Sequence, residues 1–237
     1  MSLQYFFPLN KRARLLLKLD SLFQELDHLK QTADYITARQ AIERMFEILQ
    51  LIERVEIKME LAREAEKFLV KNTSHFPELQ KAIQELSAQT GKLGEELRTQ
   101  PSLISIQKRL FQTSGACVFD APSLHAWLSC EPGQRYKDLN HMYAHIGLLD
   151  HAVKELMKAY FQSFTFREEF SENGLFHLHP SSHSSIICIE IKNCLPLLIP
   201  EVSLSPKAVF LKIWAQESLL SKNIPYNGPV TLRLSEY

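Results

Sequence analysis

Apolar residues follow a helical spacing through the first two thirds of the chain. One set recurs at intervals of one or three positions and comprises Ile42, Met45, Phe46, Leu49 and Ile52. A second, longer set comprises Leu148, Leu149, Ala152, Val153, Leu156, Met157, Tyr160 and Phe161. This spacing places the apolar side chains on one face of an α-helix. The pattern therefore predicts a mostly α-helical domain over residues 8–165.

Polar and turn-forming residues predict where some of these helices begin and end. Asn10 precedes the first helical stretch, and its side chain can accept hydrogen bonds from free N–H groups of the first turn. Asp120 is a second candidate cap, with Pro122 in the first turn of a short helix. Gly91 and Gly94 are expected to break or bend a helix.

Beyond residue 165 the apolar period shortens toward that of β-strands. Residues 186–191, 209–214 and 230–235 are short, β-branched or alternating runs, typical of strands. Turn residues separate the runs, namely Asn173-Gly174, Pro196, Pro200, Pro206 and Asn227-Gly228-Pro229. The segment before Pro8 is aromatic and biased toward extended backbone. We expect an α+β protein with a small antiparallel β domain over residues 166–237, to which residues 2–7 add a strand.

Composition narrows the possible functions. The 237 residues carry 27 Lys and Arg against 27 Asp and Glu, so the net charge is zero, which disfavours a nucleic-acid-binding protein. The sequence contains no apolar run near the ~18 residues of a membrane span, and its start lacks the pattern of an export signal. The spacing of its four cysteines matches neither a zinc ribbon nor a redox motif. We therefore expect a cytoplasmic protein with no membrane or nucleic-acid partner, no metal and no cofactor.

Few residue patterns point to catalysis. Phosphate-binding loops, dinucleotide-binding motifs and nucleophile elbows are absent from the sequence. His141 and His145 are four positions apart, so one helical face could present both to a metal. A metal-dependent enzyme using this pair with Asp138 or Asp150 is the alternative interpretation. A pairing of Cys117 with His125 as nucleophile and base lacks an orienting third residue.

Local clusters of basic residues are the positive signal. Lys11, Arg14 and Lys18 share one side of the first predicted helix, because a helix turns about 100° per residue. Between residues 98 and 119 the chain carries Lys108 and Arg109, besides Arg98 at its start, and no acid. Such segregation in a neutral chain predicts either a solvated face or a docking face for a partner that bears carboxylates.

Three motifs, in this order and spacing, carry a family resemblance. They are Phe7-Pro8-Leu9-Asn10 at the start of the basic helix, Lys108-Arg109-Leu110 with Ser114-Gly115-Ala116-Cys117-Val118-Phe119-Asp120-Ala121-Pro122-Ser123-Leu124-His125-Ala126-Trp127-Leu128, and Phe166-Arg167 with Glu172-Asn173-Gly174. With these motifs the chain resembles the ZapD family of bacterial cell-division proteins over essentially its whole length.

The resemblance implies a non-enzymatic homodimer with a helical domain and a β-strand domain. It implies binding to the C-terminal tail of FtsZ, the tubulin-like division GTPase, and bundling of FtsZ filaments at the division site. Lys18 and His125 match charged positions through which the family contacts FtsZ, and the charge clusters add further candidates. We predict that the FtsZ-binding residues lie near one another and are Arg14, Lys18, Lys108, Arg109 and His125.

Overall fold

The computed structural model describes residues 2–32, 34–54, 56–72, 75–112, 120–181, 184–192, 197–205, 208–218, 220–228 and 230–236. The chain divides into two compact units. One is Lys18–Ala159, which is helical, and the other combines Met1–Leu17 with Tyr160–Tyr237 and contains the strands. The domain limits expected from the sequence, 8–165 and 166–237, stay a prediction. The predicted α+β class is confirmed.

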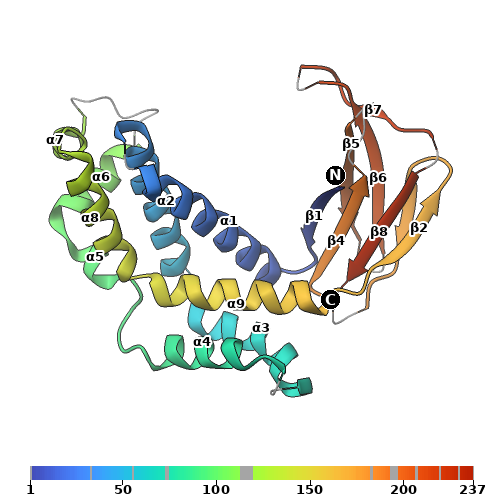
Figure 1. Ribbon diagram of the computed structural model, residues 1–237, viewed down its shortest axis with the longest axis horizontal. Coiled ribbons are helices and arrows are strands. Elements are labelled where there is room, and N and C mark those ends of the chain that lie inside the picture. The colour runs from blue at the N-terminus through green and yellow to red at the C-terminus, as the bar shows by residue number, and fades with distance from the viewer. Residues whose placement is uncertain are drawn as a thin grey trace. The chain divides into compact units, whose positions relative to one another are not determined.

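The helices of the described ranges are labelled in Figure 1. They are α1 (Lys11–Thr32), α2 (Tyr35–Arg54), α3 (Ile57–Asn72), α4 (Pro77–Ala88), α5 (Glu95–Thr99), α6 (Pro101–Gln112), α7 (Pro122–Leu128), α8 (Pro132–Ala144) and α9 (Gly147–Ser163). None of these helices has an apolar stretch long enough to cross a membrane.

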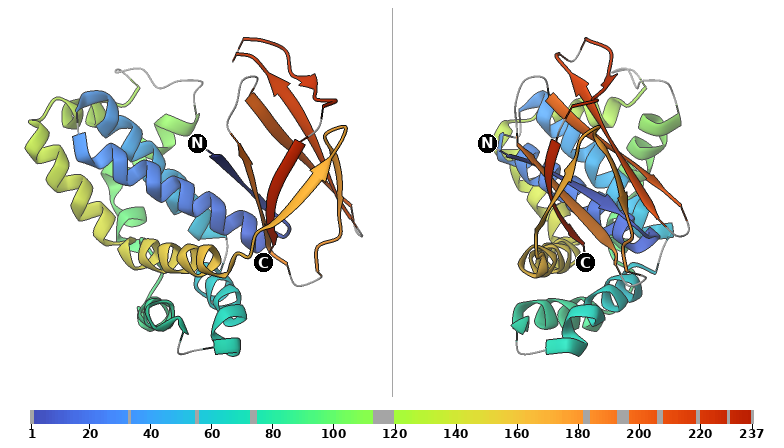
Figure 2. Two further views of the ribbon diagram at one scale, coloured as in Figure 1. Left: turned by 45° about the vertical axis from the view of Figure 1, so that its right-hand side comes forward. Right: turned by 90° about the vertical axis from the view of Figure 1, so that its right-hand side faces the viewer.

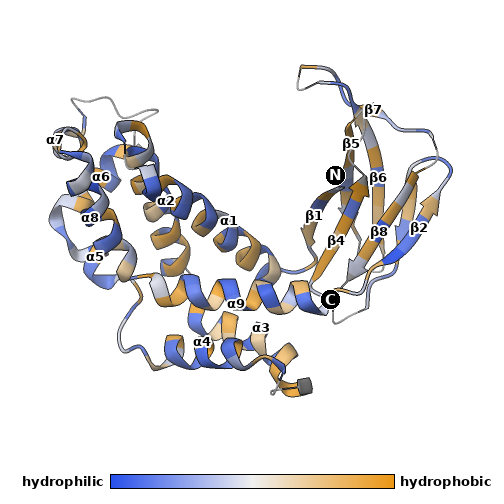
Figure 3. Ribbon diagram, in the orientation of Figure 1, coloured by the Kyte–Doolittle hydropathy of each residue, from blue (hydrophilic) through white to orange (hydrophobic). Residues whose placement is uncertain are grey.

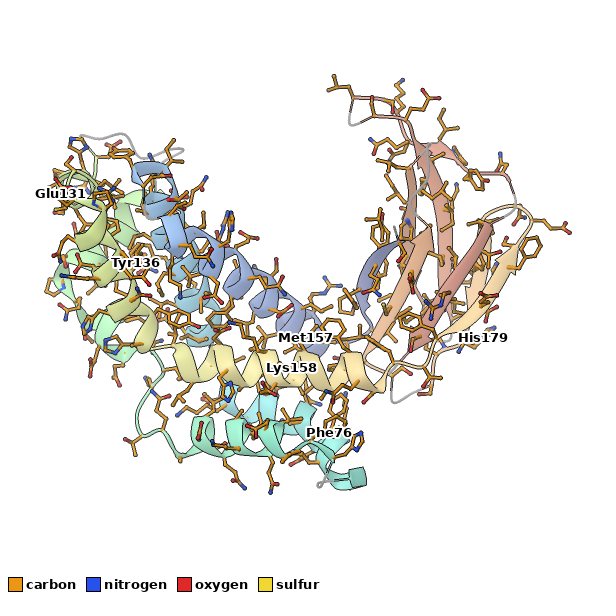
Figure 4. The ribbon with its side chains drawn as sticks, viewed as in Figure 1. Phe76, Glu131, Tyr136, Met157, Lys158 and His179 are labelled. Carbon is orange, nitrogen blue, oxygen red and sulfur yellow. The ribbon has the colours of Figure 1, made fainter. Side chains whose placement is uncertain are left out.

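The apolar stripes predicted from the sequence form the helical core. All five residues of the stripe between Ile42 and Ile52 are buried in α2. Buried and exposed residues alternate along α9. Met157 is 3% exposed, whereas its neighbour Lys158 faces solvent (Figure 4). The ends of the α9 stripe, Leu148 and Phe161, are exposed.

A closed ring of polar contacts joins α1, α8 and α9 inside the helical unit. The Lys154 ammonium donates to Asp27 at 2.6 Å and to Asp150 at 2.7 Å. The Tyr143 hydroxyl also donates to Asp150. The Lys30 ammonium lies 3.0 Å from Asp27 and 3.2 Å from the centre of the Tyr143 ring. Asp150 is buried, and these partners compensate much of the cost of burying its charge.

The strands form two antiparallel sheets. They are β1 (Ser2–Pro8), β2 (Arg167–Ser171), β3 (Leu175–Leu178), β4 (Ile186–Lys192), β5 (Leu197–Leu204), β6 (Val209–Gln216), β7 (Ile224–Pro225) and β8 (Val230–Glu236). One sheet has the order β1-β4-β8-β2. The other has the order β3-β6-β5, with β7 paired to β6. Figure 2 shows these strands in two further views.

The apolar faces of the two sheets share one core. Ile189 of β4 and Ile213 of β6 are fully buried in it, together with Leu232 of β8. The N-terminal strand belongs to this unit, because Tyr5 of β1 pairs with Ile189. Tyr5 and Phe7 also pack against the shared core. The strand predicted for residues 2–7 therefore exists and joins strands from the other end of the chain.

Two sequence-based expectations need correction. Pro200 was expected in a turn, but it lies within β5 and pairs with Ile213. A proline is compatible with an edge strand because its missing N–H can face away from the neighbour. The cap of α7 is Ala121 instead of Asp120, and it makes no side-chain cap hydrogen bond. Pro122 is the first residue of that helix, as predicted.

The turn predicted at Asn173-Gly174 depends on glycine. Gly174 has φ +69°, a conformation that L side chains rarely adopt. A Cβ built there would stand 2.5 Å from the carbonyl oxygen of Tyr226. The neighbouring Ser171 hydroxyl accepts from the N–H of Leu175 at 3.1 Å and so closes the connection from β2 to β3. Pro196, Pro206 and Pro229, expected in turns, lie outside the described residues.

Candidate partner-binding surface

The first group of predicted site residues is a basic stripe on α1. Asn10 caps the helix, because its side-chain oxygen accepts from the N–H of Ala13 at 2.9 Å. The opposite face is anchored by fully buried residues such as Leu16. Lys11, Arg14 and Lys18 are therefore held on the exposed side of the helix. We call these three residues the α1 stripe.

The second group lies where α6 meets α7 in the helical unit. Lys108 and Arg109 are exposed on α6, and Arg109 lies in its last turn. His125 is exposed on α7, and α6 contacts α7. A surface pocket of about 230 Å³ lies beside them. Its lining residues are Ser105, Ile106, Arg109, Asp120, Ala121, Pro122 and Ser123.

The start of α2 adds apolar surface to this second group. Tyr35 and Ile36 are 41% and 67% exposed, which is unusual for large apolar side chains. The Tyr35 hydroxyl lies 3.4 Å from Nδ1 of His125, and their rings meet edge to face. We call Lys108, Arg109, His125, Tyr35 and Ile36 the α6–α7 corner.

Capping by Asp34 fixes the start of α2. Its Oδ1 accepts from the N–H groups of Ile36 at 2.8 Å and of Thr37 at 2.9 Å. The hydrogen bond from Thr37 is the main reason that the pKa of Asp34 is lowered. Ionised Asp34 satisfies N–H groups that the helix itself cannot, and it thereby sets the position of Tyr35 beside His125.

Side chains of α8 hold α7 in place. The buried guanidinium of Arg135 donates to the carbonyl oxygen of Leu128 at 2.8 Å and to that of Cys130. These are carbonyls that the end of α7 leaves without helical partners. Trp127 donates from Nε1 to Asp138 at 2.9 Å. Because α7 is attached on this side, His125 remains on the exposed side.

The structure brings only part of the predicted set together. Lys108 and Arg109 lie on α6 and His125 lies on α7, and these two helices contact each other, but Lys18 lies elsewhere on the helical unit. Lys18 precedes Thr32 by fourteen residues of α1, which is about 21 Å at 1.5 Å per residue. His125 contacts Tyr35, which lies just beyond Thr32. Arg14 lies one turn further back on α1 and belongs to the other compact unit.

The residues of the metal-enzyme alternative have other partners. The rings of His141 and His145 are 5.3 Å apart, and His145 lies 3.3 Å from Glu96. Asp138 accepts from Trp127 and Gln134, whereas Asp150 accepts from Tyr143 and Lys154. Among the residues that the structure describes, three or more potential metal ligands do not come together anywhere. Cys117 lies outside these residues, so its suggested pairing with His125 is not described.

Sequence reasoning missed the apolar part of the corner. Tyr35 and Ile36 open a helix whose stripe begins later, so their exposure has no periodic signal. The contact between Tyr35 and His125 spans ninety positions of sequence, which a pattern along the chain cannot show. The one available signal was Asp34, a typical helix cap directly before two large apolar residues.

The fold and this surface describe an α+β protein with a candidate docking site for another macromolecule. The family model for ZapD, described as a cell division protein, matches residues 17–212. The chain therefore belongs to the ZapD family of cell division proteins. The matched range includes Lys18 and the whole α6–α7 corner, and it begins after Arg14.

Several proteins named cell division protein ZapD are similar over most of their length. The protein from Nitrosomonas eutropha is 26% identical over 223 residues, covering 88% of each chain. That from Dechloromonas aromatica is 28% identical over 213 residues and 84% of each chain. That from Escherichia coli is 28% identical over 182 residues, covering 71% of this chain and 74% of its own. These matches support a role in cell division.

Proposed function

We propose that the protein binds the C-terminal tail of FtsZ and that, as a homodimer, it cross-links FtsZ filaments during assembly of the division ring. Membership of a cell-division family supports the process. The observation that carries the mode of binding is the α6–α7 corner, where the exposed Tyr35 ring meets His125 and the exposed Arg109 lines a surface pocket.

The chemistry of the corner fits a short peptide that bears both carboxylates and apolar residues. Lys108 and Arg109 attract and orient the carboxylates, while Tyr35 and Ile36 offer apolar contact area. Asp120 lines the same pocket as Arg109, so the positive charge is concentrated toward the Lys108 side. This arrangement favours one orientation of the bound tail.

The α1 stripe has a different part in this proposal. Within the helical unit Lys18 lies too far from His125 for a single side chain to bridge, so in this proposal Arg14 and Lys18 act through the electrostatic field. Clustered positive charges raise the rate at which an acidic partner encounters the protein. Contacts at the corner then determine how long the tail remains bound.

Two tail sites on one dimer explain bundling without catalysis. A dimer that engages two filaments binds the second at a high effective concentration, so two weak contacts give strong cross-linking. In this proposal the protein is not an enzyme and uses no metal or cofactor. It acts in the cytoplasm at the division site, without a nucleic-acid or membrane partner.

Sedimentation of FtsZ polymers tests this function. We expect the wild-type protein to increase the amount of FtsZ polymer that pellets at low speed, where only bundles sediment. Lys108→Glu combined with Arg109→Glu should abolish that increase, because repulsion replaces attraction. Lys81→Glu is the matched control, since Lys81 is exposed on α4, and it should bundle normally. A folded double variant that bundles like the wild type would contradict the proposal.

A further inference from the structure

The two ring nitrogens of His125 have different surroundings. Nδ1 lies 3.4 Å from the Tyr35 hydroxyl. Nε2 makes no hydrogen bond or ion pair within the part of the chain that the structure describes, and the side chain is exposed. Both residues belong to one compact unit, Lys18–Ala159. The imidazole is therefore held on one side and available to a partner on the other.

The first turn of α2 departs from the one-sided pattern of the long helices. Hydrophobic and hydrophilic residues alternate along α1 and α9 (Figure 3), as expected of helices with one buried face. Tyr35 is 41% exposed in the first turn of α2. Its ring meets that of His125 edge to face, with the ring centres 6.5 Å apart. The exposed tyrosine thus has a specific neighbour at the surface.

Both members of this pair stand on helix ends that other residues fix. Asp34 caps α2 through the N–H groups of the two residues directly after Tyr35. Arg135 holds the end of α7 through the carbonyl oxygen of Leu128 at 2.8 Å, three residues after His125. Because both helix ends are fixed, little backbone freedom is lost when a partner contacts the histidine ring.

The hydroxyl beside Nδ1 determines which nitrogen of His125 carries a proton. A phenol hydroxyl donates and a bare imidazole nitrogen accepts, so the hydroxyl of Tyr35 donates to Nδ1 of the neutral ring. The proton of the neutral ring is then on Nε2. When the ring is protonated, Nδ1–H donates to the tyrosine oxygen, and Nε2 still carries a proton. Nε2 is therefore a hydrogen-bond donor in both states.

We propose that Tyr35 is a positioning residue of the tail site. It orients the ring of His125 so that Nε2–H donates to an acceptor oxygen of the bound peptide, a carboxylate or a backbone carbonyl. An apolar side chain of the same peptide lies against the exposed part of the Tyr35 ring. The pair thereby selects a peptide in which an acceptor oxygen adjoins an apolar side chain. This inference rests on the proposed function and adds the residue that orients His125.

Removal of one hydroxyl separates this role from apolar contact. Tyr35→Phe keeps the ring and deletes the donor to Nδ1. We expect it to weaken binding of a labelled FtsZ tail peptide by about threefold or more, the usual effect of one hydrogen bond. Tyr136→Phe is the matched control, since Tyr136 is also exposed, on α8 (Figure 4), and it should bind like the wild type. Wild-type affinity of folded Tyr35→Phe would overturn the proposal.

A double-mutant cycle shows whether the hydroxyl acts through His125. In a His125→Ala background Tyr35→Phe should cause no further loss of peptide affinity, because the ring that it orients is absent. An equal loss in both backgrounds would mean that the hydroxyl contacts the peptide directly. That result would overturn the positioning role.

Nitrogen NMR of the protein without peptide tests the hydrogen bond itself. At about pH 8.5, well above the usual pKa of histidine, the bare nitrogen and the N–H nitrogen of an imidazole give separate resonances. We expect Nδ1 of His125 to be the bare nitrogen, and its resonance to move in Tyr35→Phe but not in Tyr136→Phe. His125→Ala assigns the signal. A proton on Nδ1, or an unmoved resonance, would overturn the inference.

The two measurements distinguish this inference from the proposed function. Failure of the wild type to bind the peptide would contradict the proposed function, and the role of Tyr35 in the tail site with it. Wild-type binding of the peptide together with an unmoved Nδ1 resonance would overturn the positioning role alone.

Discussion

A buried charged residue can determine the position of an exposed residue on the same surface. Arg135 is 6% exposed, yet its guanidinium donates to carbonyl oxygens of Leu128 and Cys130 at the end of α7. A buried cation is stable only when such partners replace water. Because Arg135 fixes α7 from within, His125 can remain at the surface beside Tyr35. The surface chemistry of the corner thus depends on a residue that never contacts a partner.

The polar ring around Asp27 predicts how stability depends on pH. Burial raises the pKa of Asp27, but hydrogen bonds and charge from Lys154 and Lys30 outweigh burial and lower it overall. A carboxyl whose pKa is lower when folded stabilises the fold above its unfolded value of about 3.9, and this stabilisation is lost as pH falls through the folded pKa. Urea unfolding should therefore show a smaller loss of stability between pH 6 and pH 3 for Asp27→Asn than for the wild type. An identical loss in both proteins would exclude this contribution.

Residue-scale prediction from the sequence succeeded where the chemistry is local. The Asn10 cap was predicted because its acceptor serves an N–H only three residues away. Asp120 was expected as a cap by the same rule, but α7 begins after Ala121 without a side-chain cap. The partners of Arg135 and Asp150 were not predicted. The ring of polar contacts that includes both Asp27 and Asp150 joins three helices that only the tertiary fold brings together.

Elements with a strong period were predicted best. The stripe of α2 and the alternation of β8 follow directly from periods of 3.6 and 2. β2 was missed because Arg167, Glu168 and Glu169 carry no strand signal, and its pairing with β8 positions it. β5 was missed because Pro200 resembles a turn in the sequence, although an edge strand tolerates it.

The N-terminal strand yields a stability prediction at this scale. Phe7 is half-buried against the shared core of the two sheets, whereas Gln4 is exposed. Complete truncation of a core Phe costs about 3–5 kcal/mol, so partial burial suggests about 2 kcal/mol for Phe7→Ala. Gln4→Ala should change the free energy of unfolding by less than about 0.5 kcal/mol. Chemical denaturation at equal protein concentration measures both free energies of unfolding. A loss for Phe7→Ala as small as that for Gln4→Ala would show that β1 does not contribute to the core.

At the scale of the whole molecule, the sequence indicated the charges of the site but not their grouping. Because the net charge is zero, the local basic clusters could be recognised as segregated charge. The family resemblance indicated Lys18 and His125. Their separation follows from the length of α1, which places Lys18 far from the start of α2. The apolar contribution of Tyr35 and its neighbour Ile36 became evident only when the fold placed Tyr35 beside His125.

The proposed cross-linker has two tasks, tail binding and self-association. The α6–α7 corner, which we propose for tail binding, belongs to the helical unit. Cross-linking needs both, because a monomer with one tail site can occupy only one filament.

Binding of a labelled FtsZ tail peptide, followed by fluorescence anisotropy, tests the central claim most directly. We expect the wild type to bind, with an affinity that falls as salt rises, because exposed charges are screened over about 8 Å at physiological ionic strength. Lys108→Glu with Arg109→Glu should weaken binding by about tenfold or more, since it removes two attractive charges and adds two repulsive ones. Lys81→Glu should bind within about twofold of the wild type. Unchanged affinity in a folded Lys108→Glu, Arg109→Glu variant would contradict the account and place the tail on another surface.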